Sequence, residues 1–136
     1  MTDGLDQALV NAGLDRLRAD PQLTVHDGVV PDEATPPYVL VYAQVEWPDG
    51  DPDNTVEGKT EAVTARWTCH CVGSTAAAAR AVAQRVRTQL LDYRPTVAGV
   101  ECAPIGQAES VPPTRDESTG RLVMDAVVVY ELTARI

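Results

Sequence analysis

The sequence predicts an α+β domain, a mostly antiparallel sheet with two helices packed on one face. Three observations lead to this prediction. Two segments alternate apolar and polar residues with a period of two, as strands with one buried face do. Another segment repeats apolar residues at helical spacing. The elements follow the order helix, strands, helix, strands, and no linker or internal repeat divides the chain, so we expect one domain over residues 1–136.

A first helix is expected over residues 3–18, because leucine and alanine recur near one helical face. Gly13 should weaken the middle of this helix, and Asp20-Pro21 should end it. A short extended segment follows at 23–28, and a loop rich in proline and acidic residues precedes residue 38.

The centre of the sheet is expected to be a long antiparallel hairpin. Residues 38–47 form its first strand, and an acidic, turn-rich stretch from 48 to 54 leads toward the second strand, at 59–72. The residues that should face the core are Val39, Val41, Ala43, Val45 and Trp47 on the first strand, and Val63, Ala65, Trp67, Cys69 and Cys71 on the second.

The second helix is expected over residues 75–91. Ser74 is its predicted N-cap, because a serine hydroxyl accepts hydrogen bonds from the free N–H groups at a helix start. Its core-facing stripe is Ala79, Val82, Ala83, Val86 and Leu90. The opposite face carries Arg80, Arg85 and Arg87.

The remainder of the chain should return to the sheet. Short strands are expected at 97–102 and 105–111, a second polar loop at 112–120, and the longest strand at 121–136. Core-facing residues on the last strand are Leu122, Met124, Ala126, Val128, Tyr130, Leu132 and Ala134, with Val127 and Val129 on the other face.

The charge is negative and uneven, with a formal net charge of -9. Through Glu61 there are 13 acidic and 3 basic residues, a net of -10, and from Ala62 there are 7 acidic and 8 basic residues, a net of +1. So acidic a chain should repel nucleic-acid phosphates. The two halves are suited to pair between subunits, and the alternative is an ordinary solvated acidic surface. No apolar stretch has the length of a membrane span and no signal peptide is visible, so we expect folding in a cytoplasm.

Cys69-His70-Cys71 resembles a metal cluster only in composition. Neighbouring side chains on a strand point to opposite faces, so His70 cannot join both cysteines on one ion. The three cysteines of the chain are therefore expected to be buried structural thiols, with a reactive thiol as the alternative.

Asp49, Asp51 and Asp53 are spaced like the first ligands of a calcium loop. The sixth position holds Asn54 instead of glycine and the twelfth holds Thr60 instead of glutamate, so a solvated hairpin tip is favoured. The sequence has no glycine-rich phosphate loop and no serine–histidine–aspartate order, and neither histidine has an acid–base partner in the sequence. We expect no enzyme, no metal and no cofactor.

The sheet face away from the helices should be polar with apolar islands. It should carry Tyr42, Gln44, Glu46, Thr64, Arg66, Thr68, His70, Asp125, Val127, Val129 and Glu131. This pattern suits an ordinary solvated face or an interface.

Three stretches of the chain carry a family resemblance. They are the segment VHDGVVPDEATPPYVLVYAQVEW at 25–47, the strand and alanine-rich helix TEAVTARWTCHCVGSTAAAARAVAQRVRTQLL at 60–91, and the last long strand. In these stretches the chain resembles the tail terminator, or tail completion, proteins of long-tailed bacteriophages. The resemblance covers most of the chain. It consists of patterns of helices and strands and not of catalytic motifs.

This resemblance implies a virion protein, assembled in the host cytoplasm, that forms a homo-hexameric ring on the head-proximal end of the tail tube. The ring would end tube growth and offer a surface for joining the head, while DNA passes through it without specific binding. Its partners would be the tail tube protein and the head–tail connector or neck proteins, with no membrane. The alternatives are another neck protein, for head closure or as an adaptor, and a small cytoplasmic α+β enzyme or ligand-binding dimer with a thiol near Trp67.

The family's contacts are surfaces and loops, so the resemblance carries over regions only. The residues expected at the ring interface are Arg80, Arg85, Arg87, Asp27, Asp32 and Glu33. The residues expected in loops that contact the tube or the neck are Asp49, Asp51, Asp53, Asn54, Arg115, Asp116 and Glu117.

Overall fold

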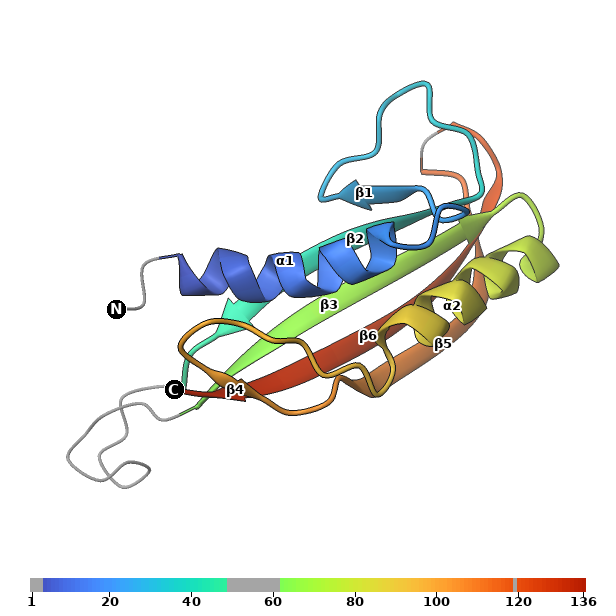
Figure 1. The fold of residues 1–136 in the computed structure, drawn as a ribbon. Coiled ribbons are helices and arrows are strands. Elements are labelled where there is room, and N and C mark those ends of the chain that lie inside the picture. Colours follow the sequence, from blue (N-terminus) through green and yellow to red (C-terminus); the bar gives the residue numbers. More distant parts are fainter. Residues whose placement is uncertain (1–3, 49–61, 119) are drawn as a thin grey trace.

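The computed structural model describes residues 4–48, 62–118 and 120–136. Figure 1 shows that both helices lie on the same side of one twisted sheet. The elements are α1 Leu5–Arg18, β1 Val25–Asp27, β2 Tyr38–Glu46, β3 Ala62–Gly73, α2 Ala76–Leu90, β4 Glu101–Cys102, β5 Gly106–Asp116 and β6 Val123–Arg135.

The sheet is built around β3, which pairs antiparallel with β2 on one side and with β6 on the other. β1 is parallel to β2 at one edge. β5 pairs antiparallel with β6 at the opposite edge, and the short β4 pairs with the last residues of β6 on that same side. The predicted α+β fold, with a mostly antiparallel sheet, is confirmed.

The predicted central hairpin is also confirmed. β2 and β3 pair in continuous antiparallel register, with Val39 opposite Cys71 and Ala43 opposite Trp67. The alternation places one set of side chains against the helices, as the period of two requires. Every predicted core residue of β3 is buried, whereas Ala43, Val45 and Trp47, in the second half of the predicted first strand, are half-buried. The predicted beginning of the second strand, before Ala62, lies outside the described residues.

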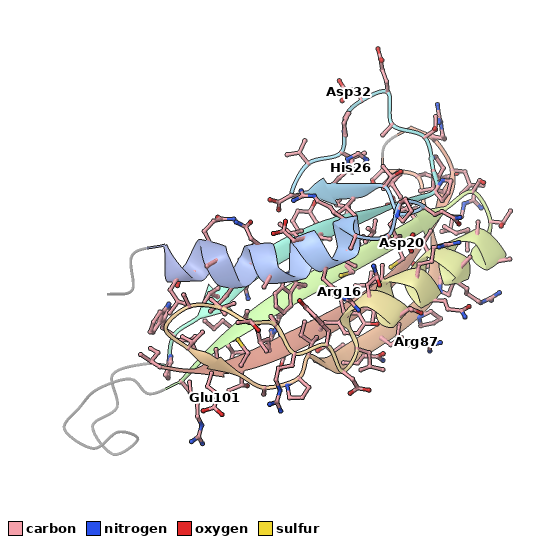
Figure 2. The ribbon with its side chains drawn as sticks, in the orientation of Figure 1. Arg16, Asp20, His26, Asp32, Arg87 and Glu101 are labelled. Carbon is pink, nitrogen blue, oxygen red and sulfur yellow. The ribbon has the colours of Figure 1, made fainter. Side chains whose placement is uncertain are left out.

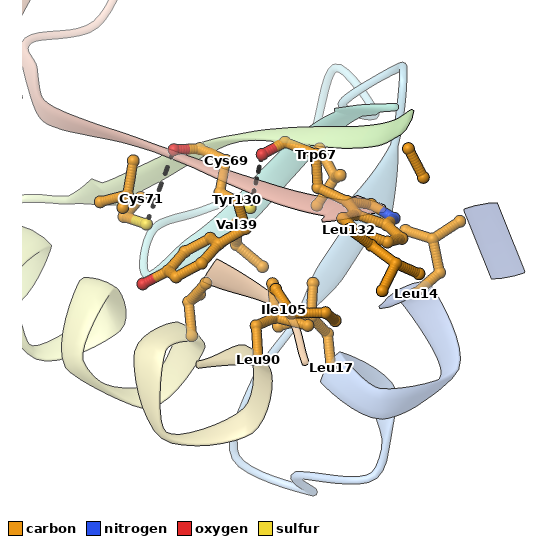
Figure 3. Close-up of a cluster of buried hydrophobic side chains, with 14 of the residues drawn as sticks. Leu14, Leu17, Val39, Trp67, Cys69, Cys71, Leu90, Ile105, Tyr130 and Leu132 are labelled. Atoms are coloured by element: carbon orange, nitrogen blue, oxygen red, sulfur yellow. Dashed lines mark hydrogen bonds between the residues drawn. The ribbon is translucent and has the colours of Figure 1, made fainter. Parts of the chain in front are cut away.

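The core lies between the sheet and the two helices (Figure 3). Trp67 is its largest fully buried side chain and lies beneath α1. The indole nitrogen of Trp67 donates a hydrogen bond to the Val10 carbonyl oxygen over 3.1 Å, so its one polar atom is satisfied. Gly13 lies directly against the same indole, which gives this glycine a packing role that the sequence prediction did not anticipate.

The N-cap of α2 is Thr75, and the prediction of Ser74 was wrong by one residue. Thr75 has an extended backbone, and its Oγ1 accepts a hydrogen bond from the Ala78 N–H over 3.1 Å. The chain turns so tightly here that a Cβ on Gly73 would lie 2.4 Å from the Ala79 nitrogen. Thr75 is therefore the residue before the first helical turn, and Gly73 lets the strand end lie close to the helix start.

β5 runs through most of the stretch that was predicted to be a loop. It continues to Asp116 across Pro112 and Pro113, where its register against β6 shifts. An edge strand tolerates proline, because its outward side needs no ladder donor, and a bulge absorbs the extra residues. The predicted strand at 97–102 is shorter than expected, because only Glu101 and Cys102 pair with β6.

Leu122 was predicted to face the core and is 51% exposed. Leu122 precedes β6, which begins at Val123, so it is not part of the sheet and is not placed against the core. Val123 is buried on the opposite face, in a small second cluster with Tyr38 and Val72. Neither helix of the described residues is long and apolar enough to cross a membrane.

Candidate assembly surfaces

The three arginines expected on one helix face are divided between two sides of α2. Arg85 has its partners within the same chain. Its Nη1 donates to Asp20 Oδ2 over 3.1 Å, and its Nη2 donates to Gln22 Oε1. The pKa of the Asp20 carboxyl is lowered, mainly by the hydrogen bond from the Gln22 N–H and also by Arg85. Arg85 therefore holds α2 to the turn that follows α1.

Arg80 and Arg87 lie on the other side of α2, facing β5. With Ala83 and Gln84 they follow the i, i+3, i+4, i+7 spacing of a single helix face. This face and β5 enclose a groove of about 340 Å³, named here the α2–β5 groove. It is lined by Arg80, Ala83, Gln84, Arg87, Gln107, Ser110, Val111, Pro112, Pro113, Ala126, Val128 and Tyr130.

Tyr130 of β6 contributes a buried phenol to this groove. Its ring lies between the sheet and α2, with the hydroxyl directed toward the helix (Figure 3). The side chain is fully buried, and its hydroxyl has no hydrogen-bond partner among the described residues. Burial raises the pKa of Tyr130, so the group stays a neutral donor. A buried hydroxyl left without a partner costs about 1–3 kcal/mol.

The acidic candidates lie at the opposite edge of the sheet from the groove. Asp27 is the exposed last residue of β1, and Asp32 and Glu33 are exposed in the loop between β1 and β2. Figure 2 shows Asp32 on this loop and Arg87 on α2, at opposite sides of the molecule. None of these three carboxylates forms an ion pair with another described residue. Within one chain, the acidic candidates therefore lie apart from Arg80 and Arg87.

The tube- and neck-contact candidates have two different outcomes. Asp49, Asp51, Asp53 and Asn54 lie outside the described residues.

Arg115, Asp116 and Glu117 were predicted to lie in a loop, which was wrong for the first two. Arg115 and Asp116 end β5, and Glu117 follows it. Arg115 Nη2 donates to Glu117 Oε1 over 2.7 Å. The Ser118 N–H donates to Asp116 Oδ1 over 2.8 Å, and this hydrogen bond lowers the pKa of Asp116. The segment is a structured strand end because β6 pairs with it.

The sheet face away from the helices carries polar pairs that the sequence did not reveal. His70 Nδ1 lies 2.8 Å from Asp125 Oδ2, and this hydrogen bond raises the pKa of His70. Tyr42 meets the His70 ring edge-on, at 5.6 Å between ring centroids. Arg66 Nη2 donates to Glu131 Oε1 over 2.6 Å. His70 and Asp125 are diagonal neighbours across β3 and β6, so only the register of the strands could have paired them.

The thiols are buried, as predicted. Cys69 and Cys71 are fully buried on the helix side of the sheet, while His70 between them lies on the other side. Burial raises the pKa of Cys71 to about 12 and that of Cys69 further, so neither is a ready thiolate. Within residues 4–48, 62–118 and 120–136, no three His, Cys, Asp or Glu side chains gather in a way that could hold a metal ion.

The comparisons with known proteins agree on one kind of fold. The family model "Tail completion protein gp17" matches residues 12–131. A chain from a structure of the virion of a native gene transfer agent particle superposes with a TM-score of 0.69, at 19% identity over 93% of both chains. A second solved chain superposes with a TM-score of 0.61, at 17% identity over 98% of both chains. No curated protein matches the chain significantly.

Proposed function

The chain belongs to the tail completion protein gp17 family, a family of phage tail structural proteins, and we propose that it caps the tail tube. In this proposal it forms a homo-hexameric ring on the head-proximal end of the tube. The ring ends tube growth and offers the surface to which the head is joined. The chain would act as a part of the virion and not as an enzyme.

One observation carries this proposal, namely the separation of the two arginines on α2 from the three carboxylates at and beyond β1. Arg80 and Arg87 lie beside β5, while Asp27, Asp32 and Glu33 lie at or beyond β1. A two-fold dimer formed through one edge would bring that edge against its own copy and would oppose like charges. A head-to-tail contact brings unlike edges together, and such contacts close into rings when the rotation permits.

Contacts along the particle axis are assigned to the remaining candidates. The tube or neck contacts would be made by Asp49, Asp51, Asp53 and Asn54 and by Arg115, Asp116 and Glu117, at the end of β5. The formal net charge of -9 supports a channel through which DNA slides, because lysine and arginine contacts to phosphates would hold it.

The test is to delete the gene and measure the length distribution of the tails by negative-stain electron microscopy. Overlong tubes are the expected result, because nothing would stop polymerisation of the tube protein. Tubes of normal length that fail to join heads would instead assign the chain to head closure or to an adaptor role in the neck. Normal infectious particles would overturn the structural proposal. A plasmid copy of the wild-type gene is the matched control and should restore tail length.

A further inference from the structure

We infer that the α2–β5 groove receives carboxylate side chains from a second copy of this chain, supplied by the segment from Asp27 to Glu33. The inference rests on the proposed ring and goes further, because it says which residues meet across the contact. Arg80 and Arg87 bind the carboxylates, and Tyr130 donates a hydrogen bond at the floor of the groove.

The cationic side of the contact is available in the single chain. Arg80 and Arg87 are exposed and form no ion pair with another described residue. They are two helical turns apart, which places their backbones about 10 Å from each other. Adjacent carboxylates on a loop, such as Asp32 and Glu33, can approach the two guanidinium groups together. Arg85 has no such role, because Asp20 and Gln22 already bind it.

The Tyr130 hydroxyl is the second observation that points to a ligand. It is a buried donor without a described partner, at the floor of a groove whose walls carry two positive charges. An incoming carboxylate would accept this hydrogen bond and remove the cost of leaving the donor unsatisfied. Side chains that line the groove must move aside for this contact, because the hydroxyl is covered in the free chain.

The form of β5 explains why the groove takes side chains rather than an added strand. Pro112 and Pro113 lack N–H groups, and the register shifts twice along the strand. Prolines and bulges of this kind block the pairing of a second strand with a sheet edge. A second copy that contacts this edge must therefore bind through side chains in the α2–β5 groove and not through an added strand.

The experiment uses charge reversal on each side and then both variants together. One variant carries Arg80→Glu and Arg87→Glu, and the other carries Asp32→Lys and Glu33→Lys. Each is produced from a plasmid in the deletion host, and its incorporation into purified particles is measured by immunoblot. Each variant alone should lose at least about tenfold in incorporation, which corresponds to about 1.4 kcal/mol in total.

Co-expression of the two variants should restore incorporation. In an alternating ring, each reversed groove meets a reversed loop and each native groove meets a native loop, so every contact regains opposite charges. The matched control is Arg94→Glu with Arg135→Glu, which makes the same change in net charge outside the groove. Wild-type incorporation of the groove variant, equal loss in the control, or failure of the mixture would each overturn the inference.

Tyr130→Phe distinguishes a role of the hydroxyl in the contact from a role in the stability of the chain. It should lower incorporation about fivefold, the equivalent of about 1 kcal/mol, while the unfolding midpoint of the isolated chain stays the same or rises. An unchanged incorporation would remove Tyr130 from the contact and overturn that part of the inference.

A disulfide test distinguishes failure of the inference from failure of the proposed function. A chain with Asp32→Cys and Arg87→Cys should give a ladder of cross-linked copies on oxidation in cells that assemble tails. Asp6→Cys with Arg87→Cys is the control and should give none, because Asp6 lies on α1, away from the acidic loop. If the double-cysteine chain gives a ladder but deletion of the gene leaves tail length normal, the groove contact is supported and tube capping is rejected. If it gives no ladder but the deletion makes tails overlong, tube capping is supported and the groove contact is rejected.

Discussion

The α-carbon of Gly13 lies against the indole of Trp67 so closely that a Cβ at this position would be 2.3 Å from Trp67 Cε2. Real side chains do not approach to this distance, so any larger residue must displace the indole or α1. Trp67 is fully buried and bonded to the Val10 carbonyl, and it has little freedom to move. The glycine thus sets how closely α1 approaches the sheet.

Gly13→Ala should destabilise the chain by up to about 2 kcal/mol, because overpacking costs about 1–3 kcal/mol and alanine regains about 1 kcal/mol in a helix. Chemical denaturation should show a lower midpoint. Asn11→Ala, on the exposed side of the same helix, is the control and should change stability by no more than about 0.5 kcal/mol. A Gly13→Ala chain that is as stable as wild type would mean that the indole moves freely.

Thr75→Ala should cost about 1 kcal/mol, because the first turn of α2 loses the hydrogen bond between Thr75 Oγ1 and the Ala78 N–H. Ser74→Ala, at the adjacent exposed position, should have almost no effect. Thermal unfolding of the two variants checks the assignment directly. Equal losses, or a larger loss at Ser74, would contradict the observed cap.

The contribution of the His70–Asp125 pair should depend on pH. The hydrogen bond to Asp125 raises the pKa of His70 above its unfolded value, so the protonated histidine is favoured in the folded chain. This stabilisation is fully present below the unfolded pKa of about 6.5 and is lost as the pH rises through the raised pKa. Asp125→Asn should therefore lower the free energy of unfolding more at pH about 6 than at pH about 9. The difference should be about 0.5 kcal/mol, because water partly screens the pair.

The measurement is denaturation of Asp125→Asn and wild type at both pH values, with His70→Gln as the second background. In His70→Gln, the pH dependence of the Asp125→Asn effect should vanish. A cost of Asp125→Asn that does not change with pH in the native background would show that His70 does not titrate against Asp125.

The three thiols should label slowly in the folded chain and at once in denaturant. Cys69, Cys71 and Cys102 are buried, and burial raises the pKa of each, which lowers the fraction of reactive thiolate. Reaction with an aromatic disulfide reagent, followed by absorbance, measures the rate. Fast labelling of one cysteine in the folded chain would contradict burial and would support the alternative of a small thiol-dependent enzyme.

Much of the fold follows from local pattern. The alternation in β3 and the helical stripe of α2 depend only on near neighbours in the chain, and the buried face is the one that the pattern indicates. The pairing of β2 with β3 fits this pattern as well, because the buried faces of neighbouring strands must lie on the same side of the sheet. The errors fall at boundaries and at Pro112-Pro113, where proline predicted a loop and an edge position allowed a strand.

Residue type and short-range spacing were enough to predict the two helices, the central strands, most of their buried faces and the charge imbalance. The spatial arrangement of the elements was needed to show which arginine has a partner within the chain, since Arg85 meets Asp20 while Arg87 faces β5. It also decided the partner of His70 and the contact of Gly13 with Trp67. Each of these joins residues far apart in the chain, and their distance depends on strand register and on the depth at which each helix packs against the sheet.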